Sequence, residues 1–428
     1  MLLFLAACAT DGPPDDAPTF YQDVGPLLNE HCGGCHRSGG IAPFTFETAE
    51  DAAALSELIV NATTSRRMPP WPARETETCA PPSPWVDDLR LTDGEIATLE
   101  AWHLAGAPAG PAATLEPPDD VTALSEPSVM LAPPTSVTID GVEDQYLCRS
   151  FDPQLDETVW ATGLQVVPGD PAVVHHALVF ADPTGASADR GDEVWPCFGG
   201  SGVPGTDLLQ PWVPGQLPYE LPPNAGFRLD PGSRFVVSVH YHPVPGEVHE
   251  DATGLEIRWT TEQPERPAFV SLFGNRQGLQ PRPADRTNEP EFFIPAGART
   301  HTETFHLELE PNSPTYRIFS VGGHLHWVGT AIDVRLEHSE GEDCLLDIPE
   351  WDFDWQLLYR YDALLDDLPT ISPGDRLVIR CTYDNSLDNP EVAALLGEQG
   401  LTEPIDVTLG EQTTDEMCLA MLGVVPAR

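Results

Sequence analysis

One stretch of the sequence decides how most of the chain folds: Phe235-Val236-Val237-Ser238-Val239-His240-Tyr241-His242. Valine and phenylalanine favour β-strands, and successive side chains of a strand point to opposite faces. The rings of His240 and His242 would therefore lie on the same face, where two imidazoles can hold one metal ion. The stretch predicts a strand that ends at a metal site.

Two other stretches combine a strand-like run with histidines. They are Val173-Val174-His175-His176-Ala177 and Val321-Gly322-Gly323-His324-Leu325-His326-Trp327. The adjacent rings of His175 and His176 need a bend or bulge to converge, because neighbours on a strand face opposite ways. A single histidine is most often structural, but three clusters at strands or strand ends are hard to explain as core packing. We expect these clusters to bind metal.

The C-terminal two thirds of the chain alternates short β-type runs with turns. Runs such as 316–321 and 376–381 are bounded by proline, glycine and aspartate, and the whole chain contains 46 prolines and 35 glycines. Many short strands separated by turns indicate β-sandwiches or jelly rolls. Residues from 135 onward are too many for one small sandwich, so we predict two all-β jelly-roll sandwiches, at 135–265 and 266–428.

Residues 19–110 have a helical pattern instead. An apolar stripe between Phe20 and Leu28 has helical spacing, and Thr92 with Glu95 forms a capping box that predicts the start of a last helix. We therefore expect a small all-α domain at 19–110. A linker rich in proline and alanine, at 111–134, would join it to the sandwiches.

The helical domain contains Cys32-Gly33-Gly34-Cys35-His36, the C-x-x-C-H signature of covalent haem attachment. Two alternative interpretations of this motif are a redox-active dithiol and half of a zinc site. A dithiol would not need His36, and a zinc site would need a second C-x-x-C motif, which the sequence lacks. Cys32 and Cys35 would bind the haem vinyl groups, and His36 the iron. Met68 is the candidate second axial ligand, with a plain core residue as the alternative. The segment resembles a small class I cytochrome c, which implies one haem c and electron transfer.

The first residues, Met1-Leu2-Leu3-Phe4-Leu5-Ala6-Ala7-Cys8, resemble the end of a bacterial lipoprotein signal. Residues 1–18 would then be a signal and tether, and the exported protein would be anchored to a membrane, in the periplasm or at the cell surface, through lipid on Cys8. An ordinary N-terminal cysteine is the alternative. Beyond Cys8 and the C-x-x-C pair, an even number of cysteines remains, which suggests disulfides in an exported protein: Cys79, Cys148, Cys197, Cys344, Cys381 and Cys418.

The chain is strongly acidic. Its formal net charge is −47, and all 21 basic residues are arginines. Such a surface repels nucleic acid, so we expect no nucleic-acid partner. An acidic surface that is well solvated by water explains this charge. The same surface would weakly favour the binding of a cationic redox donor.

Five stretches match, in chain order, the type II, ascorbate-dependent copper monooxygenases, the family of peptidylglycine α-hydroxylating and dopamine β-monooxygenases. They are His175-His176, Val239-His240-Tyr241, His324-Leu325-His326, Cys381-Thr382-Tyr383-Asp384-Asn385 and Thr414-Asp415-Glu416-Met417-Cys418. Each stretch is weak alone. Together and in the family's order, they make the C-terminal two thirds of the chain resemble that family.

This resemblance implies two separated copper ions, one in each sandwich. An electron-storing copper would be held by His175, His176 and His240, and an oxygen-binding copper by His324, His326 and Met417. A soft thioether such as that of Met417 suits Cu(I), although a methionine there can also be a buried apolar side chain. Five further histidines match no ligand position and are expected to be structural: His242, His249, His301, His306 and His338. The resemblance also implies the disulfides Cys148–Cys197 and Cys381–Cys418, which leaves Cys79 and Cys344 to pair with each other.

The sequence also departs from the amidating members of the family. Those enzymes hold a peptide carboxylate with Arg, Asn and Tyr, where this chain has Gly322, Leu419 and Met421. We therefore expect a small organic substrate that is uncharged or apolar. The aromatic residues of 347–355 would line a pocket or, more simply, fill the core.

The predicted function is hydroxylation of a C–H bond with O₂, with electrons supplied or relayed by the fused c-type haem. A different class of function is a non-catalytic copper/haem electron carrier or copper-binding lipoprotein. A degenerate adhesion module is a third, against which the presence of all six copper ligands counts.

Overall fold

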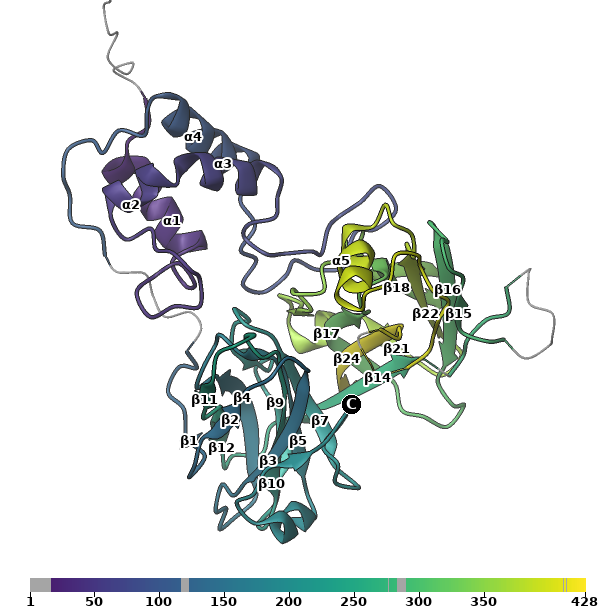
Figure 1. Cartoon of the computed structure of the whole chain (residues 1–428). Helices are drawn as coiled ribbons and strands as arrows, with labels where there is room; N and C mark the ends of the chain where they lie inside the picture. The colour runs from purple at the N-terminus through teal and green to yellow at the C-terminus, as the bar shows by residue number, and fades with distance from the viewer. Residues whose placement is uncertain (1–16, 117–122, 276, 283–289, 411, 413) are drawn as a thin grey trace, which may run out of the picture. The chain divides into compact units, whose positions relative to one another are not determined.

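The computed structural model describes residues 17–116, 123–275, 277–282, 290–410, 412 and 414–428 (Figure 1). The chain divides into two compact units. The first comprises Met1–Trp71 and Asp88–Thr122, and the second Pro72–Asp87 and Ala123–Arg428. The predicted lipid-bearing Cys8 and part of the predicted linker lie outside the described residues.

The described part of the first unit consists of helices joined by loops. The helices are η1 (Phe20–Val24), α1 (Gly25–His31), α2 (Ala49–Ala54), α3 (Ser56–Thr64) and α4 (Asp93–Leu104). Phe20 and Leu28 of the predicted stripe pack with Trp102 of α4 in one buried core. The predicted capping box is confirmed: Thr92 Oγ1 accepts from the amide of Glu95, whose carboxylate accepts from the amide of Thr92 at 2.7 Å. In the part of the chain that the structure describes, no helix is long and apolar enough to cross a membrane.

The second unit begins with a β-sandwich. In one sheet the strand order is β6-β3-β10-β5-β7. In the other sheet it is β1-β12-β4-β9-β13, and β8 also pairs with β4. The strands β2 and β11 form a small third sheet. The strands are β1 (Val129–Leu131), β2 (Val137–Ile139), β3 (Gln145–Phe151), β4 (Val159–Val167), β5 (Val174–Asp182), β6 (Trp195–Pro196), β7 (Asp207–Trp212), β8 (Tyr219–Glu220), β9 (Ala225–Leu229), β10 (Arg234–Tyr241), β11 (His249–Asp251), β12 (Gly254–Thr260) and β13 (Arg266–Pro267), with the short helix η2 (Ala186–Arg190) between β5 and β6.

A second sandwich follows directly after β13. One sheet has the order β14-β24-β17-β20, with β21 beside β17, and the other has the order β16-β22-β18-β19; β15 pairs with β23. Its elements are β14 (Phe269–Gly274), β15 (Phe293–Ile294), β16 (His301–Glu308), β17 (Tyr316–His324), β18 (Gly329–His338), β19 (Gly341–Ile348), β20 (Leu358–Arg360), η3 (Leu365–Asp367), β21 (Thr370–Ile371), β22 (Arg376–Tyr383), α5 (Pro390–Glu398), β23 (Val407–Thr408) and β24 (Leu419–Pro426). The predicted β-sandwich architecture is confirmed, and the finer jelly-roll topology stays a prediction.

All three predicted strands that carry histidines, β5, β10 and β17, lie inside their sheets. β10 runs between β3 and β5, and β17 runs between β24 and β20. β10 is buried along almost its whole length, which explains its valine-rich, non-alternating sequence. A central strand is fixed by hydrogen bonds on both sides, so the side chains at its end are held in place by the sheet.

All six cysteines outside Cys8 and the C-x-x-C pair form disulfides. The pairs are Cys148–Cys197 in the first sandwich, Cys381–Cys418 in the second, and Cys79–Cys344. These are the three expected pairs. Three disulfides fit an exported protein, because thiols stay reduced in most cytosols.

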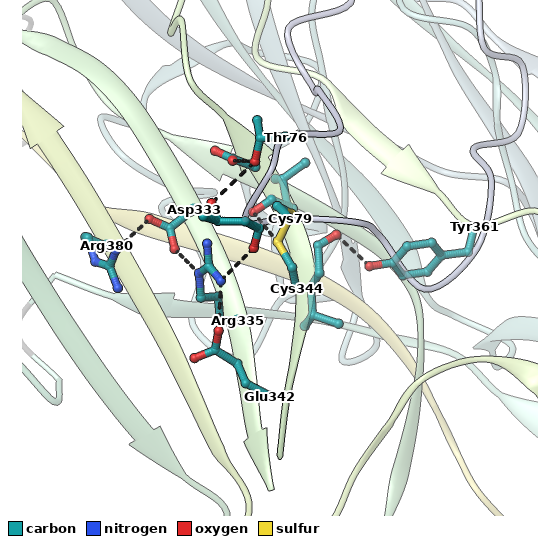
Figure 2. Close-up of a disulfide and its surroundings, with 12 residues drawn as sticks. Thr76, Cys79, Asp333, Arg335, Glu342, Cys344, Tyr361 and Arg380 are labelled. Atoms are coloured by element: carbon teal, nitrogen blue, oxygen red, sulfur yellow. Dashed lines mark hydrogen bonds and ion pairs between the residues drawn. A yellow bond between two sulfur atoms is a disulfide. The ribbon is translucent and has the colours of Figure 1, made fainter. Parts of the chain in front are cut away.

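The third disulfide fastens a segment that we call the strap, Pro72–Asp87, onto the second sandwich (Figure 2). The Thr76 hydroxyl donates to Asp347 Oδ2 at 2.8 Å, and Trp85 stacks on Tyr361 with ring centroids 4.9 Å apart. The sequence grouped these residues with the helical domain at 19–110. The structure instead packs them against the second sandwich, because their buried cysteine and tryptophan have partners there.

Beside this disulfide lies a network of charged side chains on β18, β19 and β22. The Arg335 guanidinium contacts Asp333 at 2.7 Å and Glu342 at 2.8 Å, and Arg380 lies 3.7 Å from Asp333 (Figure 2). Arg335 also donates to the main-chain oxygen of Thr78 in the strap at 3.1 Å. The strap is therefore held to the sandwich by covalent, aromatic and polar contacts.

Candidate metal centres

Three histidines of the first sandwich, His175, His176 and His240, meet at the end of two paired strands. We call them the first set. β5 and β10 are antiparallel, and His176 lies directly opposite His240. The next pair joins Val174 to Tyr241, so His175 is an extra residue in β5. This is the bulge that two adjacent histidines need in order to face the same way.

The ligand atoms of the first set converge. His176 Nδ1 lies 3.1 Å from His175 Nδ1 and 3.3 Å from His240 Nδ1. One nitrogen of each of the three rings lies within 4.8 Å of the others, as a metal site requires. The structure thus brings together all three residues that the sequence proposed for this site.

A carboxylate on the far side of His240 favours the tautomer that binds metal. His240 Nε2 lies 2.9 Å from Asp144 Oδ2. A carboxylate there favours a proton on Nε2 and leaves the Nδ1 lone pair directed at the other two rings. Tyr146 stacks on the His240 ring at 4.3 Å, almost parallel, and restrains its orientation. Asp144 and Tyr146 were not predicted from the sequence; their position just before Cys148, whose disulfide was expected, was the available signal.

Burial keeps the rings of His176 and His240 neutral. It lowers the pKa of His176 well below its ordinary value, and the neighbouring imidazoles His240 and His175 lower it further. Burial also lowers the pKa of His240, against the opposing effect of Asp144. A neutral imidazole is the ligating form, so protons compete weakly for this site near neutral pH.

In the second sandwich, His324 and His326 form a second pair of imidazoles. His324 is the last residue of β17, and His326 lies just beyond the strand, with ring centroids 5.0 Å apart. His324 Nδ1 donates to Gln356 Oε1 at 2.5 Å, and His326 Nδ1 donates to the main-chain oxygen of Asp415 at 3.1 Å. Both hydrogen bonds leave the lone pair on Nε2. The sequence did not indicate the part played by Gln356.

The segment that carries Met417 is tied to this pair by a buried glutamate. Glu416 Oε1 accepts from the main-chain amides of His326 at 2.5 Å and Met417 at 2.8 Å. Leu419, at the start of β24, pairs with His324 in the sheet. His324, His326 and the backbone of Met417 are therefore neighbours, and we call these three residues the second set. The role of the Met417 thioether as a third ligand stays a prediction.

Glu416 is fully buried and lies beside both ligand segments. Burial raises the pKa of its carboxyl group to about 8, against several main-chain hydrogen bonds that lower it. Its Oε2 has no hydrogen-bond partner among the described residues. Burial likewise lowers the pKa of His326 to about 3, so this ring is neutral in the folded protein.

Gly322, Leu419 and Met421, the positions where the chain differs from the amidating enzymes that its motifs resemble, lie on β17 and β24 beside His324. Gly322 pairs with Met421, and a side chain at Gly322 would meet the Met421 methyl group at 3.4 Å. Met421 is buried. The surroundings of His324 on these strands are therefore apolar, without the cation that a carboxylate substrate would need.

A small cavity of ≈ 220 Å³ lies against the first set. Its lining includes His175 and His242 from the first sandwich and Asp354 and Trp355 from the second. One aromatic residue of the 347–355 stretch thus lines a pocket, whereas the sequence favoured a core position for this group. The cavity gives solvent and small molecules a route to the ring of His175.

The five histidines predicted to be structural lie outside both sets. Four of them lie beside carboxylates: His242 contacts Asp144, His249 contacts Asp170, His301 contacts Glu303 and His338 contacts Asp343. His306 lies on β16, where burial lowers its pKa.

The C-x-x-C-H motif lies on the loop after α1 in the first unit. Cys32 and Cys35 are free thiols, and burial raises the pKa of Cys32 to about 12. His36 Nδ1 donates to the main-chain oxygen of Phe44 at 3.1 Å, which leaves the lone pair on Nε2. The rings of Phe44 and Phe46 stack on His36 at 5.1 and 4.5 Å. Met68 is partly buried at the end of the first segment of this unit, and its role as a haem ligand stays a prediction.

Comparison with known proteins points to one kind of enzyme. No family model matches the chain. The chain is 24% identical over 387 residues to "DBH-like monooxygenase protein 1" of Gallus gallus, an alignment that covers 83% of this chain and 57% of that protein. The chain therefore spans little more than half of that relative's length. The similarity supports a distant relation to the dopamine β-monooxygenase-like proteins, the family that the histidine stretches resemble.

Proposed function

We propose that the protein is a copper-dependent monooxygenase that hydroxylates a C–H bond of an organic substrate with O₂. The observation that carries the proposal is the convergence of one ring nitrogen from each histidine of the first set, in the same unit as the imidazole pair of the second set. The similarity to a protein named a monooxygenase supports it.

The donor atoms suit copper. The first set offers three imidazoles, and the second offers two imidazoles with a thioether on a neighbouring segment. Cysteine thiolates, which zinc often recruits, are absent from both sets, since the nearby cysteines form disulfides. Imidazole and thioether ligands together select copper, and a soft thioether favours Cu(I).

Bound copper would supply one-electron redox chemistry and oxygen activation. The protein's own part is to fix the ligands. Asp144 favours the correct tautomer of His240, and Gln356 does the same for His324. Glu416 holds the Met417 segment against His326, so that the third donor of the second set stays near the imidazoles.

The substrate we propose is uncharged or apolar. Gly322, Leu419 and Met421 stand beside His324 where amidating relatives hold a carboxylate, and none of them is charged. A buried carboxylate without a cation costs several kcal/mol of binding free energy. An apolar molecule pays no such cost and would lie against Met421.

We propose that a c-type haem in the first unit supplies or relays the electrons. Cys32 and Cys35 are free thiols at C-x-x-C-H spacing, and the His36 lone pair on Nε2 remains for iron. Met68 would be the second axial ligand. Because one chain carries both units, the effective concentration of the electron donor is high. Export with a lipid anchor at Cys8 completes this proposal.

Isotope incorporation tests the oxygenase proposal. Extracts from wild-type and deletion strains grown under ¹⁸O₂ should differ in a product that carries one ¹⁸O atom, and purified protein should bind about two copper ions. Met417→Ala should abolish product formation while the first set keeps its copper. A non-catalytic copper carrier would instead lose only part of its copper affinity and would show no labelled product in any variant.

Stopped-flow spectroscopy tests the haem proposal. Reduced haem should be reoxidised when the copper sites are oxidised, and the Cys32→Ala/Cys35→Ala variant should lack covalent haem. Haem that stays reduced in the presence of oxidised copper would contradict the relay and leave the oxygenase proposal intact.

A further inference from the structure

A single loop of the second sandwich touches both sets of ligands. This loop, 351–357, lies in the connection between β19 and β20, and we call it the bridging loop. Phe353, at its centre, stacks on His175 of the first set with centroids 5.3 Å apart and an interplanar angle of 29°. The same ring meets His326 of the second set edge-on at 6.3 Å and an angle of 88°. Phe353 therefore contacts one imidazole ring from each set.

Two other side chains of the bridging loop reach the sets. Asp354 Oδ1 lies 3.7 Å from His175 Nε2, and Gln356 Oε1 accepts from His324 Nδ1 at 2.5 Å. Gln356 also donates to the main-chain oxygen of Phe353 at 2.9 Å, which closes the turn of the loop. Thus Asp354 contacts the first set and Gln356 contacts the second, and both residues follow Phe353 closely in the chain.

Phe353 is held firmly in this place. It is only 8% exposed, and the ring of Trp327 stacks on it with centroids 4.7 Å apart. A packed aromatic ring excludes water from the volume it fills.

We propose that Phe353 is the side chain through which an electron passes between the two metal centres, and that the bridging loop exists to hold it there. The inference rests on the proposed function. With copper bound at both sets, a single electron would pass from a Cu(I) ion held by the first set to a Cu(II) ion held by the second. The first ion would be oxidised, the second would be reduced, and no bond would form or break. Electron tunnelling is faster through packed atoms than through a gap of the same length, so a ring in contact with a ligand of each set shortens the effective path.

The alternative role for Phe353 is packing between the sandwiches. The two roles differ in what a leucine does at this position. Leucine keeps an apolar side chain in the volume but removes the ring that spans from His175 to His326. Packing alone predicts a small loss of stability and an unchanged rate of electron exchange. A role of the Phe353 ring in electron transfer predicts an unchanged fold and a slower exchange of electrons between the two metal centres.

The experiment follows electron redistribution in the full-length, copper-loaded protein. The dicupric protein receives less than one electron per chain by pulse radiolysis under anaerobic conditions, and samples are frozen at intervals for EPR. The variants His240→Ala and Met417→Ala assign the two Cu(II) signals. Haem absorbance is recorded in the same samples, so that electrons taken up by the first unit are counted separately.

We expect Phe353→Leu to slow the exchange between the two copper signals roughly 10-fold, while the copper content and both EPR signals stay unchanged. Phe353→Tyr keeps the ring and should restore the wild-type rate. Phe227→Leu removes a buried ring from β9, on the sheet that lacks the histidines, and should leave the rate unchanged.

An exchange rate in Phe353→Leu equal to that of the wild type overturns the bridge, as does loss of either Cu(II) signal from that variant, which would make Phe353 a packing residue. These results leave the oxygenase proposal standing. A wild-type protein that binds fewer than two copper ions, by contrast, overturns the proposed function and the bridge with it.

Discussion

The two sets of ligands are built in different ways. The first set lies on two neighbouring strands, where the pairing of β5 with β10 places His176 opposite His240 and a bulge adds His175. The second set takes His324 from the end of β17, while His326 and Met417 come from segments outside any strand. One site is fixed by a β-ladder, and the other by hydrogen bonds between a strand end and two loops.

This difference fits two different tasks. Three imidazoles on a rigid sheet give a closed ligand set whose geometry changes little when the metal changes its charge, which suits an electron store. A pair of imidazoles with a donor on a separate segment leaves room for a further ligand, which suits O₂. If this comparison is right, substitutions at the two sets should have separable effects.

The largest effect is expected from His240→Ala. It removes the one ligand of the first set that lies on the central strand, so we expect the copper content to fall from about two ions per chain to about one, with loss of product formation. Elemental analysis with EPR measures this. His306→Ala, on β16 of the other sandwich, is the control and should bind a full complement of copper. If the His240→Ala protein kept both Cu(II) signals, the proposal that the first set binds copper would be wrong.

Removal of the strap disulfide should affect stability rather than either metal. Cys79 and Cys344 are buried, and their bond joins the strap to β19 of the second sandwich. We expect the double variant Cys79→Ser/Cys344→Ser to lose about 2–4 kcal/mol in free energy of unfolding. Denaturant titration of the copper-loaded protein measures this loss.

The first set serves as the internal control for that variant, since it lies in the other sandwich. Its Cu(II) EPR signal should not change when the strap is released. A changed first-set signal would mean that release of the strap also displaces the bridging loop, which follows β19 and contacts His175 through Phe353.

The sequence predicted the parts of the sites that lie close together along the chain. Strand type, the adjacent His175-His176 pair with its need for a bulge, and the His324-Leu325-His326 pair all follow from local patterns. The partners Asp144 and Gln356 could not be predicted in this way, because each is dozens of residues from the histidine that it contacts. Only the pairing of strands and the course of loops brings them together.

Irregular segments were harder still to predict. The strap has no periodic pattern, so its chain position assigned it to the helical domain, although its cysteine and its tryptophan Trp85 pack on the second sandwich. Phe353 was expected in a core because buried aromatic residues usually fill cores. It is indeed buried, but between two sets of imidazoles, a setting that depends on the whole tertiary fold.

Glu416→Ala should weaken the second set alone. The glutamate accepts from the amides of His326 and Met417, so its loss leaves two buried amides unpaired and frees the Met417 segment. We expect a roughly 10- to 100-fold loss of second-set copper affinity. Glu416→Gln keeps one accepting oxygen and should lose less. Competitive copper titration, with each signal followed by EPR, measures both variants.

A second buried glutamate in the same sandwich separates this effect from general destabilisation. Glu303 is also fully buried, but its partners are Arg282 and His301, which belong to neither set. Glu303→Ala should lower the free energy of unfolding without a selective change in copper affinity. Equal copper losses in Glu303→Ala and Glu416→Ala would show that Glu416 has only a general structural role.

The smallest effect should come from Asp144→Asn, which tests whether the first set needs its carboxylate. An asparagine has the same shape and can still accept from His240 Nε2, but it no longer stabilises that proton by charge. We expect first-set copper affinity to fall by roughly 10-fold, with a shifted Cu(II) hyperfine coupling and an unchanged second-set signal. Asp170→Asn is the matched control, because Asp170 pairs with His249, outside both sets. If both variants leave the first-set signal unchanged, the strand ladder alone orients His240, and the contrast between a ladder-built and a hydrogen-bond-built site becomes sharper.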